Sequence, residues 1–233
     1  MMEMTQRNET DDFVVKRNYA KKGLNEIIYE DLKKKIFRGD VFSDGRLQED
    51  NLTKDYGTSR TPIRDALRRL EQEKIIEKLH YGGYKVKELS IKDVEEIFGI
   101  RSVLESYAAS LATGRITKDD ITRMETIIKK SQEALDNTDY EAFIELNTEF
   151  HACLYAAGKS EHLLRILQNL WDYFYRYRKV ILRTRHNMED SLKNHMIMME
   201  KMKEGDRETV ERLVREHVDK ALLVLKEELR KTD

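Results

Sequence analysis

Hydrophobic residues near the start of the chain recur three and four positions apart, which is the spacing of one helix face. The residues that follow this spacing are Leu24, Ile27, Ile28, Leu32 and Ile36. They predict a helix over 24–38 that ends at Gly39, and a short helix over 49–56 follows and ends at Gly57. Residues 1–23 are polar and lack such a period, so we expect a flexible N-terminal arm.

A third helix is expected to begin at Ser59 or Thr61, because both residues can cap a helix and Pro62 suits its first turn. After this helix the hydrophobic period changes to alternation, first over 75–79 and again over 84–87. Two alternating runs separated by a glycine-containing turn predict a β-hairpin. Three helices followed by a hairpin are the layout of a winged helix-turn-helix.

From Ser90 onward the pattern is helical, and several of its breaks carry Thr, Asp or Ser as capping residues. The expected helices cover 91–113, 118–136, 139–157, 160–185, 188–204 and 206–230. Short connections make successive helices antiparallel neighbours. We therefore expect a mainly α protein, with a winged helix-turn-helix over 24–88 and an antiparallel all-α bundle of about six helices over 89–233.

The composition agrees with this fold, since 39% of the residues are hydrophobic, 37% are charged and one is proline. The chain has no apolar run near the roughly 20 residues that span a bilayer, and its polar start does not resemble a secretory signal. The single cysteine, Cys153, cannot form an internal disulfide. We expect a cytoplasmic protein without a membrane partner.

The third predicted helix has two chemically different faces. Its apolar face is formed by Ile63, Ala66, Leu67 and Leu70. On another face Arg60, Arg64 and Arg68 recur at every fourth position. The net charge of the whole chain is only -1, so no broad basic surface is expected. The positive charge is instead concentrated locally, on this arginine face. Guanidinium groups suit guanine edges and phosphate oxygens, which makes this face a candidate for DNA contact.

Neighbouring residues complete the candidate DNA surface. Ser59 and Thr61 lie where hydroxyl groups at a helix start can bind phosphate. Gly82 and Gly83 allow the hairpin tip to lie close to a groove, with His80 as a polar contact. An arginine stripe alone is more typical of a solvated helix face, but the helix-turn-helix context favours contact with DNA.

Polar residues interrupt the apolar faces of the bundle helices, where a buried polar group needs a partner. They are Arg101, Glu105, Asn147, His151, His195 and His217. A lone histidine of this kind is usually a satisfied core residue. Three histidines and an asparagine on three helices instead predict a transition-metal site built from neutral imidazoles. Arg101 requires either Glu105 or an incoming carboxylate as its partner.

Residues 52–70, which read LTKDYGTSRTPIRDALRRL, resemble the signature of GntR-family bacterial regulators. The resemblance implies that Ser59, Arg60, Thr61, Arg64 and the wing over 80–83 contact an operator. The chain departs from the family at Asp50, where members often carry arginine.

The bundle resembles the FCD effector domain of the FadR subfamily, so the resemblance covers 24–230. It implies a metal on Asn147, His151, His195 and His217, with asparagine in place of the commoner aspartate, and we expect a divalent transition metal such as zinc or nickel. It also implies a small organic acid whose carboxylate completes the metal shell and is held by Arg101. Arg178 is a further candidate for binding the organic acid. It lies in an aromatic segment that is more typical of core packing.

The sequence thus favours a homodimeric, ligand-responsive transcription factor, such as a repressor, that binds a pseudo-palindromic DNA operator. One alternative is a metalloenzyme, because three histidines with an open position also hold catalytic zinc. The sequence shows no obvious general base beside the ligands and no nucleotide-binding glycine motif, so we expect no enzyme. The other alternative is a DNA-binding protein without an effector.

Overall fold

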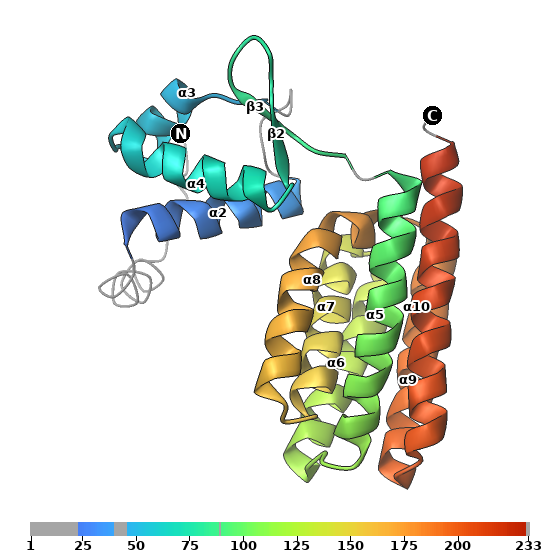
Figure 1. Cartoon of the computed structure of the whole chain (residues 1–233). Coiled ribbons are helices and arrows are strands. Elements are labelled where there is room, and N and C mark those ends of the chain that lie inside the picture. The colour runs from blue at the N-terminus through green and yellow to red at the C-terminus, as the bar shows by residue number, and fades with distance from the viewer. Residues whose placement is uncertain (1–22, 40–45, 89, 232–233) are drawn as a thin grey trace, which may run out of the picture. The chain divides into compact units, whose positions relative to one another are not determined.

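The computed structural model describes residues 23–39, 46–88 and 90–231, and the arm expected over 1–23 lies almost entirely outside these ranges. The chain divides into two compact units, Met1–Glu88 and Leu89–Asp233. Figure 1 shows the elements of each unit. Among the helices that the structure describes, none is both long and apolar enough to cross a lipid bilayer.

Over its described residues, 23–39 and 46–88, the N-terminal unit contains three helices and a small antiparallel sheet, so the winged helix-turn-helix prediction is confirmed. The helices are α2 (Leu24–Arg38), α3 (Glu49–Asp55) and α4 (Arg60–Gln72). The strands are β1 (Arg46–Leu47), β2 (Ile76–Lys78) and β3 (Tyr84–Val86), in the order β1-β3-β2. β2 and β3 form the expected hairpin, whereas β1 is too short to show alternation and has no counterpart in the prediction.

The apolar face of α4 is buried and holds the helix against α2. Its core residues Ile63, Ala66, Leu67 and Leu70 are at most 1% exposed. At the far end of α4, Glu73 accepts hydrogen bonds from Tyr29 Oη at 2.5 Å and from Lys33 Nζ at 2.8 Å, and both donors belong to α2. Because one side of α4 is fixed in this way, its other side faces outward in a defined orientation.

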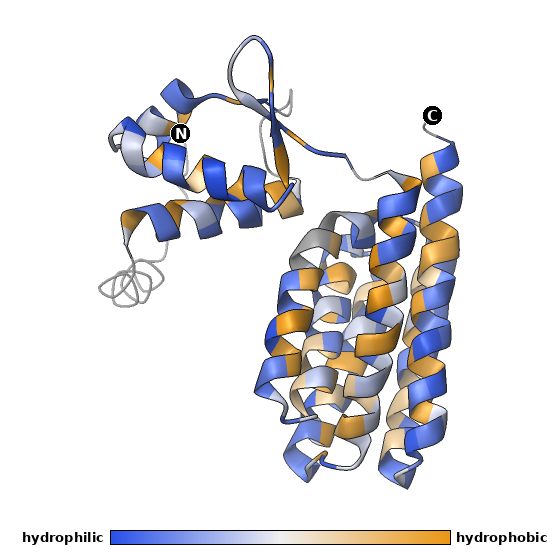
Figure 2. Ribbon diagram, in the orientation of Figure 1, coloured by the Kyte–Doolittle hydropathy of each residue, from blue (hydrophilic) through white to orange (hydrophobic). Residues whose placement is uncertain are grey.

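The C-terminal unit is an all-α bundle, as predicted. Its helices are α5 (Ile91–Thr113), α6 (Lys118–Asp136), α7 (Tyr140–Ala156), α8 (Glu161–Ile181), α9 (Arg185–Glu204) and α10 (Arg207–Arg230). Capping boxes begin two of them, Ser90 with Asp93 at α5 and Thr117 with Asp120 at α6. Hydrophobic and hydrophilic positions alternate around these helices in Figure 2, which is the pattern of faces that pack against a shared core.

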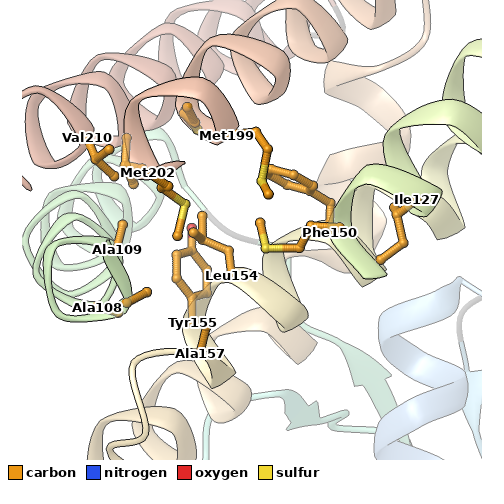
Figure 3. Close-up of a cluster of buried hydrophobic side chains, with 14 of the residues drawn as sticks. Ala108, Ala109, Ile127, Phe150, Leu154, Tyr155, Ala157, Met199, Met202 and Val210 are labelled. Carbon is orange, nitrogen blue, oxygen red and sulfur yellow. The ribbon is translucent and has the colours of Figure 1, made fainter. Parts of the chain in front are cut away.

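A large buried cluster joins all six helices from α5 to α10 (Figure 3). Small residues of α5, Ala108 and Ala109, lie close to the large side chains of the other helices. Those larger residues include Ile127, Phe150, Leu154, Met199, Met202 and Val210. The close packing of α5 against α10 and α7 fixes the helices that carry the polar residues described below.

The break between α8 and α9 corrects the predicted boundary. The sequence pattern placed it at 186–187, but α8 ends at Ile181 and α9 begins at Arg185. The reason is capping: the Thr184 side chain accepts a hydrogen bond from the Asn187 backbone N–H, and Asn187 Nδ2 donates to the Ile181 carbonyl at 2.8 Å. His186 and Asn187 therefore lie in the first turn of α9.

Candidate functional sites

The solvent face of α4 carries the residues expected to contact DNA. Ser59 occupies the N-cap position with extended backbone and makes no side-chain cap hydrogen bond. Ser59 and four residues of α4 are exposed, namely Arg60, Thr61, Arg64 and Arg68. Three guanidinium groups thus lie on one side of a helix whose opposite side is buried, and this arrangement can present hydrogen-bond donors to a polyanion.

Two of these arginines form ion pairs with the first turn of α3. Arg60 Nη2 lies 2.9 Å from Asp50 Oδ1, and Arg64 Nε lies 2.8 Å from Glu49 Oε2. Exposed pairs of this kind contribute only about 0–1 kcal/mol, so a stronger anion can replace the carboxylate. The sequence did not indicate these pairs, because they join side chains of different helices. Asp50, where the chain departs from the family pattern, therefore pairs directly with Arg60, one of the residues predicted to contact DNA.

The wing tip between β2 and β3 is shaped by two glycines with positive φ, 88° at Gly82 and 79° at Gly83. The Gly83 carbonyl accepts a hydrogen bond from the Leu79 N–H at 3.0 Å. His80 is exposed beside them, and Tyr81 is fully exposed. The tip therefore presents an imidazole and a phenol ring to solvent on a tightly turned backbone.

The bundle brings three of the predicted metal ligands together. His151 of α7, His195 of α9 and His217 of α10 each offer a ring nitrogen, and these nitrogens all lie within 4.8 Å of one another. The Nε2 atoms of His151 and His195 are 3.3 Å apart. Two imidazole nitrogens bound tetrahedrally to one zinc ion lie about 3.4 Å apart, so the observed spacing fits a shared metal.

Burial keeps these imidazoles uncharged at neutral pH. It lowers the pKa of His151 and His195 well below the ordinary value, and the neighbouring histidines add to the effect. Burial also lowers the pKa of His217 to about 4. Neutral imidazole is the form that binds a metal ion, so the cluster is ready to do so without losing protons to solvent.

Asn147, the fourth predicted ligand, lies one turn before His151 on α7 and is buried. Its Nδ2 donates a hydrogen bond to Ser191 Oγ of α9 at 2.9 Å. With the amide nitrogen used in this way, the Oδ1 atom is the one with ligand chemistry. Asn147 lines the same pocket as His151 and His217. Three nitrogen donors and one oxygen donor suit zinc or nickel.

Both predicted effector residues line this pocket as well. Arg101 Nε donates to Glu105 Oε1 at 2.7 Å, and Glu105 is one of the two partners that the sequence left open. Arg178 Nη1 donates to Thr148 Oγ1 at 2.6 Å, and burial followed by the nearby Arg101 lowers its pKa to about 10. Two buried guanidinium groups against one buried carboxylate leave the inner pocket positive.

Two features of the pocket were missed by reasoning from the sequence. At its outer part, Lys220 Nζ of α10 forms a 2.5 Å ion pair with Asp190 Oδ2 of α9. Next to the pocket residue His151, Tyr155 Oη donates to Glu105 Oε2 at 2.7 Å and lies 3.1 Å from His151 Nδ1. The spacing of four residues from His151 to Tyr155 is a signal that could have indicated this second contact.

Comparison with protein families supports both units. The FCD domain family matches residues 96–220, and the family of bacterial regulatory proteins named gntR matches residues 24–86. The HTH-type transcriptional regulator YdhC of Bacillus subtilis (strain 168) is 31% identical over 190 residues, which cover 81% of this chain and 85% of YdhC. The gluconate operon transcriptional repressor of Bacillus licheniformis is 27% identical over 195 residues, which cover 81% of this chain and 79% of the repressor.

Solved structures share the fold. Escherichia coli McbR/YncC superposes with a TM-score of 0.74 at 24% identity and covers 88% of this chain and 98% of its own. The metal-free FCD domain of TM0439 superposes with a TM-score of 0.54 at 16% identity and covers 62% of this chain and 99% of its own. The chain therefore belongs to the GntR family of bacterial regulatory proteins and carries an FCD domain.

Proposed function

We propose that this transcriptional regulator binds a pseudo-palindromic operator as a homodimer, and that a small organic acid held at a metal site in the bundle changes its DNA affinity. One observation carries the proposal: the same chain combines an outward arginine face with a pocket of neutral histidines and buried arginines. The acid regulates only if it binds the DNA-competent and the DNA-incompetent forms with unequal affinity.

The proposed DNA contacts belong to α4 and the wing. They are Ser59, Arg60, Thr61, Arg64, Arg68, His80, Gly82 and Gly83. The exposure of the arginines and the fixed orientation of α4 on α2 support this assignment, since a recognition helix needs one buried and one free face. In this proposal DNA replaces Asp50 and Glu49 as the partner of Arg60 and Arg64.

The test of the DNA surface begins with selection of a binding sequence from random duplexes. Arg60→Ala and Arg64→Ala are each expected to weaken binding to the selected DNA by about 1–3 kcal/mol, or about 5- to 150-fold. Arg212→Ala is the matched control, because it removes an exposed arginine of α10 that pairs with Glu216. Unchanged binding in both α4 variants would contradict the proposal that the arginine face of α4 contacts DNA.

An exposed apolar stripe on α5 supports the homodimer. Ile100, Val103 and Tyr107 follow helical spacing, and each is more than half exposed. Three large apolar side chains on one outward face are a surface that a second copy of the chain can cover by two-fold symmetry. Symmetry of this kind matches a pseudo-palindromic operator, whose half-sites each bind one winged unit.

His151, His195, His217 and Asn147 are the residues that would hold the divalent metal. Their neutral imidazoles, the 3.3 Å separation of two of the nitrogens and the oxygen donor of Asn147 support zinc or nickel. A bound divalent cation supplies concentrated positive charge to the pocket. Arg101 and Arg178 add positive charge next to the ligands, so the chemistry selects an anion.

The anion that fits best is a small carboxylate. Polar side chains of α9 and α10 that line the pocket, such as Asn187, Asn194 and Lys220, can also bind hydroxyl groups of an organic acid. A relative regulates a gluconate operon, and gluconate is itself a hydroxylated carboxylate.

A thermal-shift screen of small carboxylic acids tests the effector. In metal-loaded protein a ligand at about 100 times its Kd should stabilise the fold by about 2.7 kcal/mol and raise Tm. Arg178→Met, which removes the guanidinium but keeps an apolar stem, should abolish the shift. A screen without any shift in metal-loaded protein would contradict the organic-acid effector.

A further inference from the structure

Beyond the ligands themselves, we propose that Glu105 and Tyr155 position His151 for metal binding by holding its proton on Nδ1, so that its Nε2 lone pair faces His195 and His217. The proposal rests on the metal site described above. Neither Glu105 on α5 nor Tyr155 on α7 is a proposed metal ligand. Their role would be to prepare one of the ligands, His151.

Glu105 is completely buried. Burial alone would raise its pKa, but the Arg101 guanidinium holds the pKa below its usual value, so the group is a carboxylate. Its Oε1 accepts from Arg101 Nε at 2.7 Å, and its Oε2 lies 2.7 Å from Tyr155 Oη. A carboxylate has no hydrogen to donate, so the Tyr155 hydroxyl must donate to it.

The direction of this hydrogen bond determines the next one. The Tyr155 hydroxyl has a single hydrogen, and the hydrogen bond to the Glu105 carboxylate uses it, since Oη lies 2.7 Å from Oε2. Once the hydrogen points to Glu105, the Tyr155 oxygen can only accept from His151 Nδ1, which is 3.1 Å away. His151 Nδ1 therefore carries the N–H.

A neutral imidazole carries only one N–H, so Nε2 of His151 has a lone pair. This atom is the one that lies 3.3 Å from His195 Nε2, inside the cluster of three histidines. The opposite tautomer would direct a hydrogen into the cluster and set the Nδ1 lone pair against the Tyr155 oxygen. Partners that hold a ligating histidine in this manner typically contribute about 10- to 100-fold in metal affinity.

Tyr155→Phe tests the positioning, and Tyr140→Phe, which removes an exposed hydroxyl from the same helix, is its matched control. Imidazole ¹⁵N NMR of chelator-treated protein should show His151 as the Nδ1–H tautomer in the wild type and in Tyr140→Phe. In Tyr155→Phe the preference should be lost. Titration with Co²⁺ should give a Kd about 10- to 100-fold weaker in Tyr155→Phe only.

Glu105→Gln provides a second variant with an opposite prediction. Arg101 needs an acceptor, so the glutamine oxygen should face Arg101 and its amide N–H₂ should face Tyr155. The tyrosine oxygen then accepts from the amide, and its hydrogen turns to His151 Nδ1. The tautomer of His151 should reverse to Nε2–H, a change that loss of packing alone would not produce.

Three outcomes would overturn the proposal or its foundation in distinguishable ways. A wild-type His151 with its proton on Nε2, or an unchanged tautomer in both Tyr155→Phe and Glu105→Gln, overturns the positioning itself. Equal Co²⁺ affinity in wild type and Tyr155→Phe overturns its effect on metal binding. A wild-type protein that binds no Co²⁺ overturns the metal site, and the positioning with it, even where the tautomer is Nδ1–H.

Discussion

Replacing Gly83 by alanine should open the wing, whereas the same replacement at Gly82 should leave it nearly closed. Both glycines have positive φ, so both variants carry backbone strain. A Cβ on Gly83 would lie 2.9 Å from the carbonyl oxygen of Leu47 in β1, while a Cβ on Gly82 meets no atom within 4 Å. The two variants therefore differ in a single collision with the backbone of β1.

The expected magnitudes follow from backbone strain, which both variants carry, and from the collision, which only Gly83→Ala adds. Left-handed backbone costs an alanine about 1–2 kcal/mol, and the lower entropy of its unfolded chain returns about 0.4–1 kcal/mol. Gly82→Ala should therefore destabilise the wing by about 1 kcal/mol. The collision in Gly83→Ala adds about 1–3 kcal/mol, the usual cost of overpacking. The free energy of opening the wing should therefore be lower in Gly83→Ala than in Gly82→Ala. Amide exchange in the wing should be about 5- to 150-fold faster in Gly83→Ala as a result.

Hydrogen exchange measured by NMR provides the assay, with the Leu79 amide as the probe because it donates to the Gly83 carbonyl at 3.0 Å. Exchange at Leu79 should be much faster in Gly83→Ala than in Gly82→Ala, and affinity for the selected DNA should fall in the same order. Equal exchange rates in the two variants would refute the reasoning, because close approach of the wing to β1 would then not hold it.

Three further predictions concern the proposed DNA-contacting face of α4, the dimer and the histidines. Asp50→Asn removes the carboxylate beside Arg60 and should strengthen DNA binding about 2- to 10-fold by fluorescence anisotropy, with an unchanged Kd as the contrary result. Val103→Glu should yield a monomer by sedimentation velocity, while the exposed Lys130→Glu stays dimeric; a dimer in both would exclude the α5 stripe. Burial lowers the pKa of His217 to about 4, so the unfolded chain gains a proton first as pH falls, and stability is lost below about pH 6.5. In chelator-treated protein, urea unfolding followed by Trp171 fluorescence should show a loss of about 1.4 kcal/mol at about pH 5.5 from this group, and His217→Gln should reduce it; equal pH dependence in both would contradict it.

The helices were predictable because their signals are local. The period of α2 and its end at Gly39, which has φ of 77°, depend on neighbouring residues only, and so does the Ser90 cap of α5. β1 could not be found in this way, since two residues become a strand only through pairing with β3. The predicted boundary between α8 and α9 was wrong for a related reason: the Thr184 side chain caps the Asn187 backbone N–H, and Asn187 Nδ2 donates to the Ile181 carbonyl.

In the candidate site, too, features with a local sequence signal could be predicted, whereas contacts between helices could not. Histidines that interrupt apolar faces could be assigned to one core from the sequence, and the structure places His151, His195 and His217 together. The pairing of Arg60 with Asp50 and the contact of Tyr155 with Glu105 join different helices. Their existence depends on interhelical distance and side-chain rotamers, for which one sequence carries no signal.

Metal titration tests the central claim most directly. Isothermal titration of Zn²⁺ and Ni²⁺ into chelator-stripped protein should show one ion bound per chain in the wild type and in His162→Ala, which removes an exposed histidine of α8. His195→Ala should lose at least about 100-fold in affinity, since it removes one of the proposed ligands. No binding by the wild type, or equal binding by His195→Ala, would contradict a metal-centred pocket in this regulator.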